Sequence, residues 1–244
     1  MSEIWDCIVV GGGAAGLSAG LVLGRARRHA LLIDAGQQSN RSAHGIGGLL
    51  GHDGRPPVEL YRLGRDELAS YGVQIRAGEV ADIESVDGEF VVRLLGGRDE
   101  RTRRVLLATG MTYLPPDLPG IAELWGRSVF HCPFCHGWEV RDLPLAVLAD
   151  GARAVHLALL LRCWSDDIVV LTKGAAELGA DDRTRLANAG VRVDERPVAA
   201  LEAHDGELSA VVFGDGERLP RRGLLVAATL RQRDQLAERL GVAV

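Results

Sequence analysis

The hydrophobic pattern changes period several times along the first part of the chain. Residues 4–10 are apolar and β-branched, as in a buried strand, whereas residues 17–28 place apolar side chains at helical spacing. Residues 30–34 form a second short apolar run. A strand, a helix and a strand in this order predict a βαβ unit, whose strands are parallel and joined by a right-handed crossover.

The next segment predicts a long loop, a helix and hairpins. Residues 36–57 are rich in Gly, Ser, Asn and His, and residues 58–71 have the spacing of an amphipathic helix. Short alternating runs follow, separated by Asp87-Gly88 and Gly96-Gly97, which is typical of antiparallel hairpins. We expect the last run, residues 103–108, to be a buried strand.

Prolines between Leu114 and Gly120 mark the expected domain boundary, because proline continues neither a helix nor a central strand. The strand and helix pattern then repeats. The sequence therefore predicts an α/β protein of two Rossmann-like, three-layer domains, residues 1–113 and residues 114–244. The runs that carry the repeat are strands at 143–149, 167–171, 191–193 and 224–227, helices at 152–164 and 181–189, and a hairpin at 198–213.

Composition and charge narrow the class of protein. The 244 residues carry 28 Lys and Arg against 33 Asp and Glu, a net charge of −5, so neither nucleic acid nor a membrane surface is an expected partner. No apolar run is long enough to span a membrane. Four cysteines in this length do not make a secreted disulfide framework, so we expect a cytoplasmic protein. Cys7 and Cys163 stand in apolar runs and are expected to be buried.

Gly11, Gly13 and Gly16 form a G-x-G-x-x-G pattern between the first predicted strand and the first helix. In such a turn the glycines allow a tight bend and a close approach to a pyrophosphate, which the helix N-terminus binds. Asp34 ends the second strand, where a carboxylate can accept hydrogen bonds from ribose hydroxyls. The alternative is a glycine-rich turn in an ordinary α/β unit.

Cys132 and Cys135 form a C-x-x-C pair flanked by His131 and His136. Two cysteines at this spacing can close a small disulfide, and a helix start and a nearby imidazole can lower a thiol pKa, as thiol exchange requires. A zinc site and a purely structural pair remain as alternatives. No second Cys or His pair lies at finger-like spacing, so we expect no metal.

The corresponding turn of the second domain has a single glycine, Gly151, preceded by Asp150. An acidic residue there repels a pyrophosphate, and Lys173 is a lone cation after the next strand. NADPH binding is therefore expected to be weak or absent. The alternative is a degenerate site that uses Lys173 and Arg153.

These motifs, together with Ala108-Thr109-Gly110, resemble the low-molecular-weight thioredoxin reductase family over nearly the whole chain. The resemblance implies FAD in the first domain, a nucleotide domain that carries the redox disulfide, and a homodimer. His136 stands where ordinary reductases have Asp. In this respect the chain looks closer to the dithiol oxidases that close disulfides in gliotoxin and holomycin, where O2 reoxidises the flavin.

The resemblance also implies residue roles. Cys132 would exchange with the substrate, Cys135 would react with the flavin, and His136 would be the acid or base. The implied FAD contacts are Gly11, Gly13, Ala14, Ala15 and Gly16 at the pyrophosphate, Asp34 at the ribose, Ala108 near the adenosine, and Asn40 and His44 near the flavin.

One departure from the family concerns the C-terminal part. The family's flavin domain is completed by a returning Gly-Asp segment, whereas here a helix is expected at residues 230–240 and no such segment follows. The expected function is oxidation of a small-molecule or peptide dithiol through FAD, with O2 as acceptor. An NADPH-dependent thioredoxin reductase and a flavin-free binding or regulatory module are the alternatives.

Overall fold

The computed structural model describes residues 4–97, 99–172, 174 and 177–243, which group into two compact units. The first unit contains residues 4–41, 55–112 and 230–243, and the second contains residues 42–54 and 113–229. Strands β8 (Met111–Leu114) and β17 (Thr229–Gln232) pair with each other, and each carries the chain from one unit to the other.

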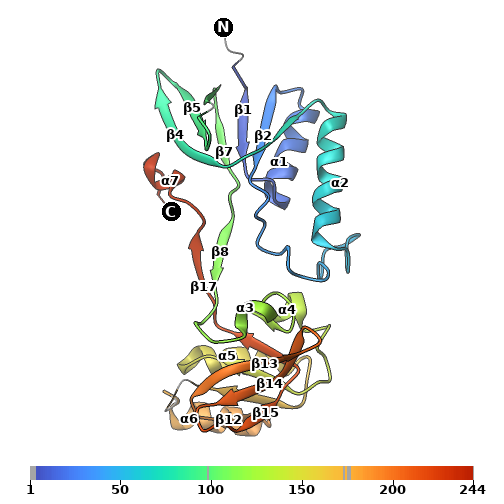
Figure 1. The fold of residues 1–244 in the computed structure, drawn as a ribbon, viewed down its shortest axis with the longest axis vertical. Coiled ribbons are helices and arrows are strands. Elements are labelled where there is room, and N and C mark those ends of the chain that lie inside the picture. Colours follow the sequence, from blue (N-terminus) through green and yellow to red (C-terminus); the bar gives the residue numbers. More distant parts are fainter. Residues whose placement is uncertain (1–3, 98, 173, 175–176, 244) are drawn as a thin grey trace. The chain divides into compact units, whose positions relative to one another are not determined.

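The first unit is built on a parallel sheet with the order β3-β2-β1-β7 (Figure 1). An antiparallel sheet with the order β4-β5-β6 belongs to the same unit. Its elements are β1 (Cys7–Val10), α1 (Ala14–Arg25), β2 (Ala30–Asp34), α2 (Pro57–Ser70), β3 (Gln74–Ala77), β4 (Val80–Val86), β5 (Glu89–Leu94), β6 (Asp99–Thr102), β7 (Val105–Leu107) and α7 (Leu236–Arg239).

Alternation along β1 explains the layers of this unit. Ile8 and Val10 point into a core shared with β4 and β5, whereas Cys7 and Val9 point into a core shared with α1 and α2. Successive strand residues face opposite sides, so a wholly apolar strand must be covered on both. Figure 1 shows the helices on one side of the parallel sheet and the hairpin strands on the other.

The second unit repeats this architecture. Its parallel sheet has the order β12-β11-β10-β16-β9, and its antiparallel sheet has the order β13-β14-β15. Its elements are α3 (Ile121–Leu124), β9 (Val129–Phe130), α4 (Pro133–His136), β10 (Leu145–Leu148), α5 (Gly151–Leu161), β11 (Ile168–Leu171), α6 (Ala180–Asn188), β12 (Arg192–Asp194), β13 (Val198–His204), β14 (Glu207–Phe213), β15 (Arg218–Pro220) and β16 (Gly223–Val226).

The expected α/β class with Rossmann-like layers is confirmed, and the helices expected before residue 230 lie within three residues of their positions. The region 230–240 differs: the strand β17 occupies its start, and only the short α7 follows. Leu236 of α7 is buried in the first unit's core, which removes residues 230–243 from the second domain in which they were expected. Residues 42–54 likewise group with the second unit.

Within the part of the chain that the structure describes, no helix combines the length and the apolar character needed to cross a membrane.

Phe213 tests the core of the second unit, because this residue is 1% exposed whereas Phe134 is 69% exposed. We expect Phe213→Ala to lower the free energy of unfolding by about 3–5 kcal/mol, through lost burial and the cavity it leaves. Phe134→Ala, which removes one edge-to-face contact with Trp164 at a ring distance of 5.4 Å, should lower it by no more than about 0.5–1.5 kcal/mol. Urea unfolding followed by circular dichroism measures both, and equal effects would contradict this packing.

Candidate functional site

The glycine turn of the first unit is a place of close backbone contact. A Cβ added at Gly11 would lie 2.3 Å from the Ala108 carbonyl oxygen, and one added at Gly16 would lie 1.8 Å from the Gly11 carbonyl oxygen. Gly11 also has a φ of 111°, a conformation that disfavours other residues. Ala108 is thus beside the turn, as expected, and the turn brings α1 close to the sheet.

Gly13 precedes α1 in an extended conformation, and no side chain of the described residues caps this helix end. The first N–H groups of a helix have no intrahelical partner. Ala14, Ala15 and Gly16 therefore present backbone donors at the positive end of the helix dipole, which suits a phosphate.

Asp34 lies beside this turn with an 11% exposed side chain. Its carboxylate accepts hydrogen bonds from the Gly36 amide (2.8 Å) and from Gln38 Nε2 (2.9 and 3.2 Å). A Cβ added at Gly12 would lie 2.3 Å from the same carboxylate. The structure therefore brings the expected ribose ligand to the turn and holds it there with local donors.

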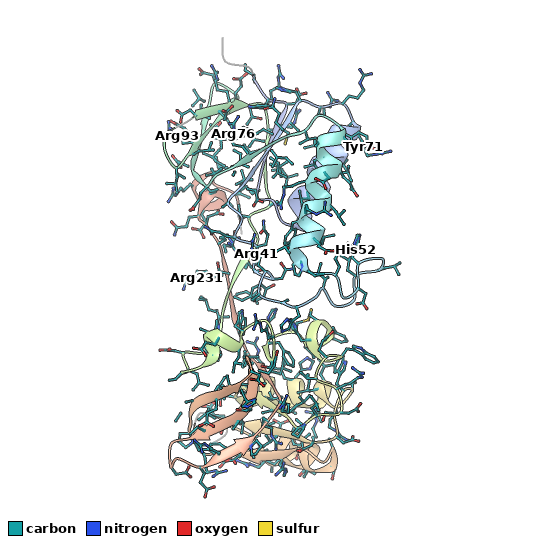
Figure 2. All side chains as sticks on the ribbon, turned by 45° about the vertical axis from the view of Figure 1, so that its right-hand side comes forward. Arg41, His52, Tyr71, Arg76, Arg93 and Arg231 are labelled. Atoms are coloured by element: carbon teal, nitrogen blue, oxygen red, sulfur yellow. A yellow bond between two sulfur atoms is a disulfide. The ribbon has the colours of Figure 1, made fainter. Side chains whose placement is uncertain are left out.

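A pocket of about 390 Å³ opens at Asp34 and includes two arginines that sequence analysis did not select. Arg41, labelled in Figure 2, donates to the Gly36 carbonyl oxygen (3.1 Å), and Arg65 Nη1 lies 3.5 Å from Asp34 Oδ2. Both can attract an anionic ligand. Neither carries a sequence signal, because one lies in a loop and the other on an amphipathic helix.

Asn40 and His44, the weaker flavin candidates, belong to different units. Asn40 Oδ1 accepts a hydrogen bond from the Tyr61 hydroxyl (2.5 Å) in the first unit. His44 Nε2 lies 3.2 Å from Glu207 Oε1 in the second unit. Each side chain therefore already has a partner within its own unit.

The C-x-x-C motif forms a disulfide between Cys132 and Cys135 at the start of α4. Cys132 precedes the helix in an extended conformation, and Pro133 occupies its first position, where the missing N–H costs nothing. Cys132 is half-buried and Cys135 is exposed. No group of three potential metal ligands occurs among the residues described.

His136 packs into the second unit beside the disulfide. Its Nε2 lies 3.2 Å from the Gly126 carbonyl oxygen, and its ring stacks on Phe130 at 5.5 Å. Burial lowers the pKa of His136, although the Gly126 and Cys132 carbonyls and the charge of Glu139 act in the opposite direction.

His131 has a comparable environment. Its ring lies 4.2 Å from that of Tyr113 and 5.7 Å from that of Trp125. Burial and the charge of His136 both lower the pKa of His131. Both histidines that flank the cysteine pair are therefore neutral over a wider pH range than an exposed histidine.

The segment 42–54 contacts the disulfide turn within the second unit. A Cβ added at Gly47 would lie 2.6 Å from the Cys135 carbonyl oxygen, and one added at Gly126 would lie 2.4 Å from Ser42 Oγ. The sequence predicts a long loop here, with His44 as a flavin candidate, but it does not predict a contact with the cysteine pair. Its glycines are the one signal that a close approach was possible, and they do not identify the partner.

At the second strand-to-helix turn, Asp150 precedes α5 and is exposed. Arg153 donates to the Ala228 carbonyl oxygen (3.1 Å) in the same unit. Lys173, the other cation of the alternative NADPH site, lies outside the described residues. The guanidinium of Arg153, one of the two cations of that alternative site, is therefore already bonded to a backbone carbonyl.

The two isolated cysteines differ. Cys7 is buried as expected, and burial raises the pKa of its thiol. The prediction for Cys163 is wrong, because this residue is exposed after the end of α5. Helical spacing alone did not show that α5 ends at Leu161.

Two such α/β units, one with a glycine turn and one with a histidine-flanked disulfide, define an oxidoreductase of the disulfide class. The model of the pyridine nucleotide-disulphide oxidoreductase family matches residues 5–244, and the chain belongs to this family. Thioredoxin reductase tcpT of Claviceps purpurea is 31% identical over 252 residues, covering 99% of this chain and 78% of the relative. Thioredoxin reductase aclD of Aspergillus oryzae is 34% identical over 239 residues, covering 93% and 75%.

Solved structures of similar proteins have the same fold as this chain. The crystal structure of HlmI has a TM-score of 0.92 at 42% identity, covering 99% of this chain and 77% of that one. The oxidoreductase from Agrobacterium tumefaciens has a TM-score of 0.93 at 39% identity, covering 99% and 81%. The expected resemblance to thioredoxin reductase-like proteins is confirmed, and the chain spans about three quarters to four fifths of these relatives.

The lowered pKa values of His131 and His136 predict a pH-dependent stability. As the pH falls below about 6.5, the unfolded chain binds protons that the folded chain resists, so the free energy of unfolding should decrease. His136→Gln should weaken this decrease, whereas His156→Gln, an exposed change on α5, should not. Urea unfolding across this pH range measures the slopes. Identical slopes in all three proteins would refute the assignment.

Proposed function

We propose that the chain is an FAD-dependent oxidoreductase that converts a small-molecule or peptide dithiol into a disulfide, with O2 as the electron acceptor. The disulfide between Cys132 and Cys135, in a member of the pyridine nucleotide-disulphide oxidoreductase family, carries this proposal. We further propose a cytoplasmic homodimer that binds neither nucleic acid nor membrane.

The glycine turn of the first unit fits FAD. The backbone donors of Ala14, Ala15 and Gly16 would bind the pyrophosphate, and Asp34 would accept from the ribose, with Arg41 and Arg65 lining the pocket beside it. Bound FAD would supply two-electron chemistry, taking electrons from the reduced cysteine pair and delivering them to O2.

The cysteine pair would perform the exchange with the substrate. A substrate thiolate attacks Sγ of Cys132, which forms a mixed disulfide and releases Cys135 as a thiolate. The second substrate thiol then attacks the mixed disulfide and releases Cys132. The substrate is oxidised by two electrons, the pair is reduced by two, and the exposed Cys135 is free to react further.

His136 would handle the protons of this exchange. It immediately follows Cys135 and its burial lowers the pKa, so the ring is neutral and can accept a proton near neutral pH. The proton comes from a thiol that must ionise before it attacks.

O2 is favoured over NADP as the second reactant by the turn before α5. The exposed carboxylate of Asp150 would repel a pyrophosphate there, and Arg153 is already bonded to a backbone carbonyl. The two alternatives to this oxidase are an NADPH-dependent reductase and a flavin-free binding module, and the experiments below distinguish them from it.

Gly16→Ala tests the FAD site, because the new Cβ has no space against the Gly11 carbonyl oxygen. We expect the purified wild type to take up FAD and the variant to bind it at least about ten-fold more weakly. Gly20→Ala, on the same helix, is the control, because its Cβ would meet the Leu68 side chain (2.7 Å from Cδ2) rather than a backbone oxygen of the glycine turn. Visible absorption and FAD titration measure binding. A wild type that takes up no FAD, or a variant that binds normally, would contradict the proposal.

Cys135→Ser tests the cysteine pair. Under anaerobic conditions a small dithiol should bleach the flavin of the wild type but not that of the variant, since the electrons have no route through the pair. Cys163→Ser should behave as wild type, because Cys163 is a separate free thiol. Stopped-flow absorption measures the bleaching. Rapid bleaching of the wild type by NADPH without dithiol would reject the oxidase in favour of the reductase.

A further inference from the structure

The hydrogen bond between His136 and Gly126 determines which ring nitrogen carries the proton. A carbonyl oxygen only accepts, so Nε2, 3.2 Å from the Gly126 oxygen, must donate. In a neutral imidazole the other nitrogen is then unprotonated. Nδ1 is buried and has no hydrogen-bond partner of normal geometry among the described residues, although the Cys132 carbonyl also acts on this ring.

Gly126 is held firmly in the position that makes this bond. It has a φ of 78° and its amide donates to the Val129 carbonyl oxygen (2.9 Å). Ser42 of the segment 42–54 packs against its α carbon, so that an added Cβ would lie 2.4 Å from Ser42 Oγ. The direction of the Gly126 carbonyl is therefore set by a turn that glycine alone adopts easily, and by a segment far away in sequence.

We propose that Gly126 is a positioning residue for the acid–base step: its carbonyl selects the Nε2–H form of His136, so that Nδ1 receives the proton. This inference rests on the proposed function. When a thiol of the pair ionises, its proton moves to Nδ1, which leaves a thiolate and an imidazolium whose Nε2–H stays bonded to Gly126. His131 and Glu139 are the other titratable groups that act on this ring or are acted on by it.

The Nδ1–H form of the His136 ring is the alternative, and the Cys132 carbonyl would favour it. The Cys132 carbonyl also attracts a proton on His136, and a proton held there on Nδ1 would leave this nitrogen unable to accept another. The two forms are distinguished by which nitrogen is protonated at a pH where the ring is neutral. Nitrogen chemical shifts separate a protonated from an unprotonated ring nitrogen directly.

The first experiment is therefore NMR of protein labelled with ¹⁵N-histidine, with His136→Gln to identify the resonances. We expect Nε2 to be protonated and Nδ1 to be bare, and a protonated Nδ1 would overturn the proposal. This readout requires neither flavin nor dithiol, so failure of the proposed function would not affect it, and it requires no glycine variant to fold.

The second experiment compares Gly126→Ala with Gly120→Ala. Both glycines have left-handed backbone, and a Cβ at either would meet an oxygen at 2.4 Å, but Gly120 faces Leu201 rather than Ser42. After reduction, alkylation of the pair at neutral pH should slow by roughly ten-fold or more in Gly126→Ala, and its pH profile should shift upward. Gly120→Ala should react as wild type. Equal slowing in both variants, or none in Gly126→Ala, would overturn the proposal.

Discussion

The α carbon of Gly16 lies so close to the carbonyl oxygen of Gly11 that a Cβ there would be 1.8 Å from it, and Gly11 in turn lies against the carbonyl of Ala108. These two backbone contacts join β1, α1 and the end of β7. Because no side chain lies between them, α1 begins directly after the end of β1. The first N–H groups of this helix remain available for a ligand. The neighbouring Asp34 is placed by the same geometry, since the absence of a Cβ at Gly12 provides the space for its carboxylate. The remainder of this site is arranged around these contacts.

The disulfide site of the second unit depends on a different balance, between burial and hydrogen bonding. His131 and His136 lie against aromatic rings, and burial outweighs the nearby carbonyls in setting the pKa of His136. A neutral imidazole is the form that can take a proton from a thiol. The disulfide itself lies at the start of a helical turn, where the local backbone and a proline bring the two cysteines together. The spacing of the two cysteines in the sequence allows the disulfide, and the packing of His131 and His136 determines the charge of the imidazoles beside it.

Local patterns were sufficient for the features that depend on neighbours in sequence. The glycine turn, the acidic end of β2 and the cysteine pair each combine a short motif with the strand or helix beside it. Arg41, Arg65, Gly126 and Ser42 were missed, because their importance comes from tertiary contacts that no sequence motif encodes. The same reason explains the errors: Cys163 is exposed because α5 ends before it, and the segment after residue 230 joins the first unit because Leu236 is buried there.

The sequence by itself determined the class of fold and the spacing that lets the cysteine pair close a disulfide, because hydrophobic period and motif spacing are properties of adjacent residues. Tertiary structure alone decided which carbonyl His136 faces, which loop contacts Cys135, and which cations stand beside Asp34. These relations depend on contacts between elements that no short sequence motif spans. A backbone carbonyl that accepts a hydrogen bond, such as that of Gly126, has no side-chain signature, so it becomes visible only when the chain is folded.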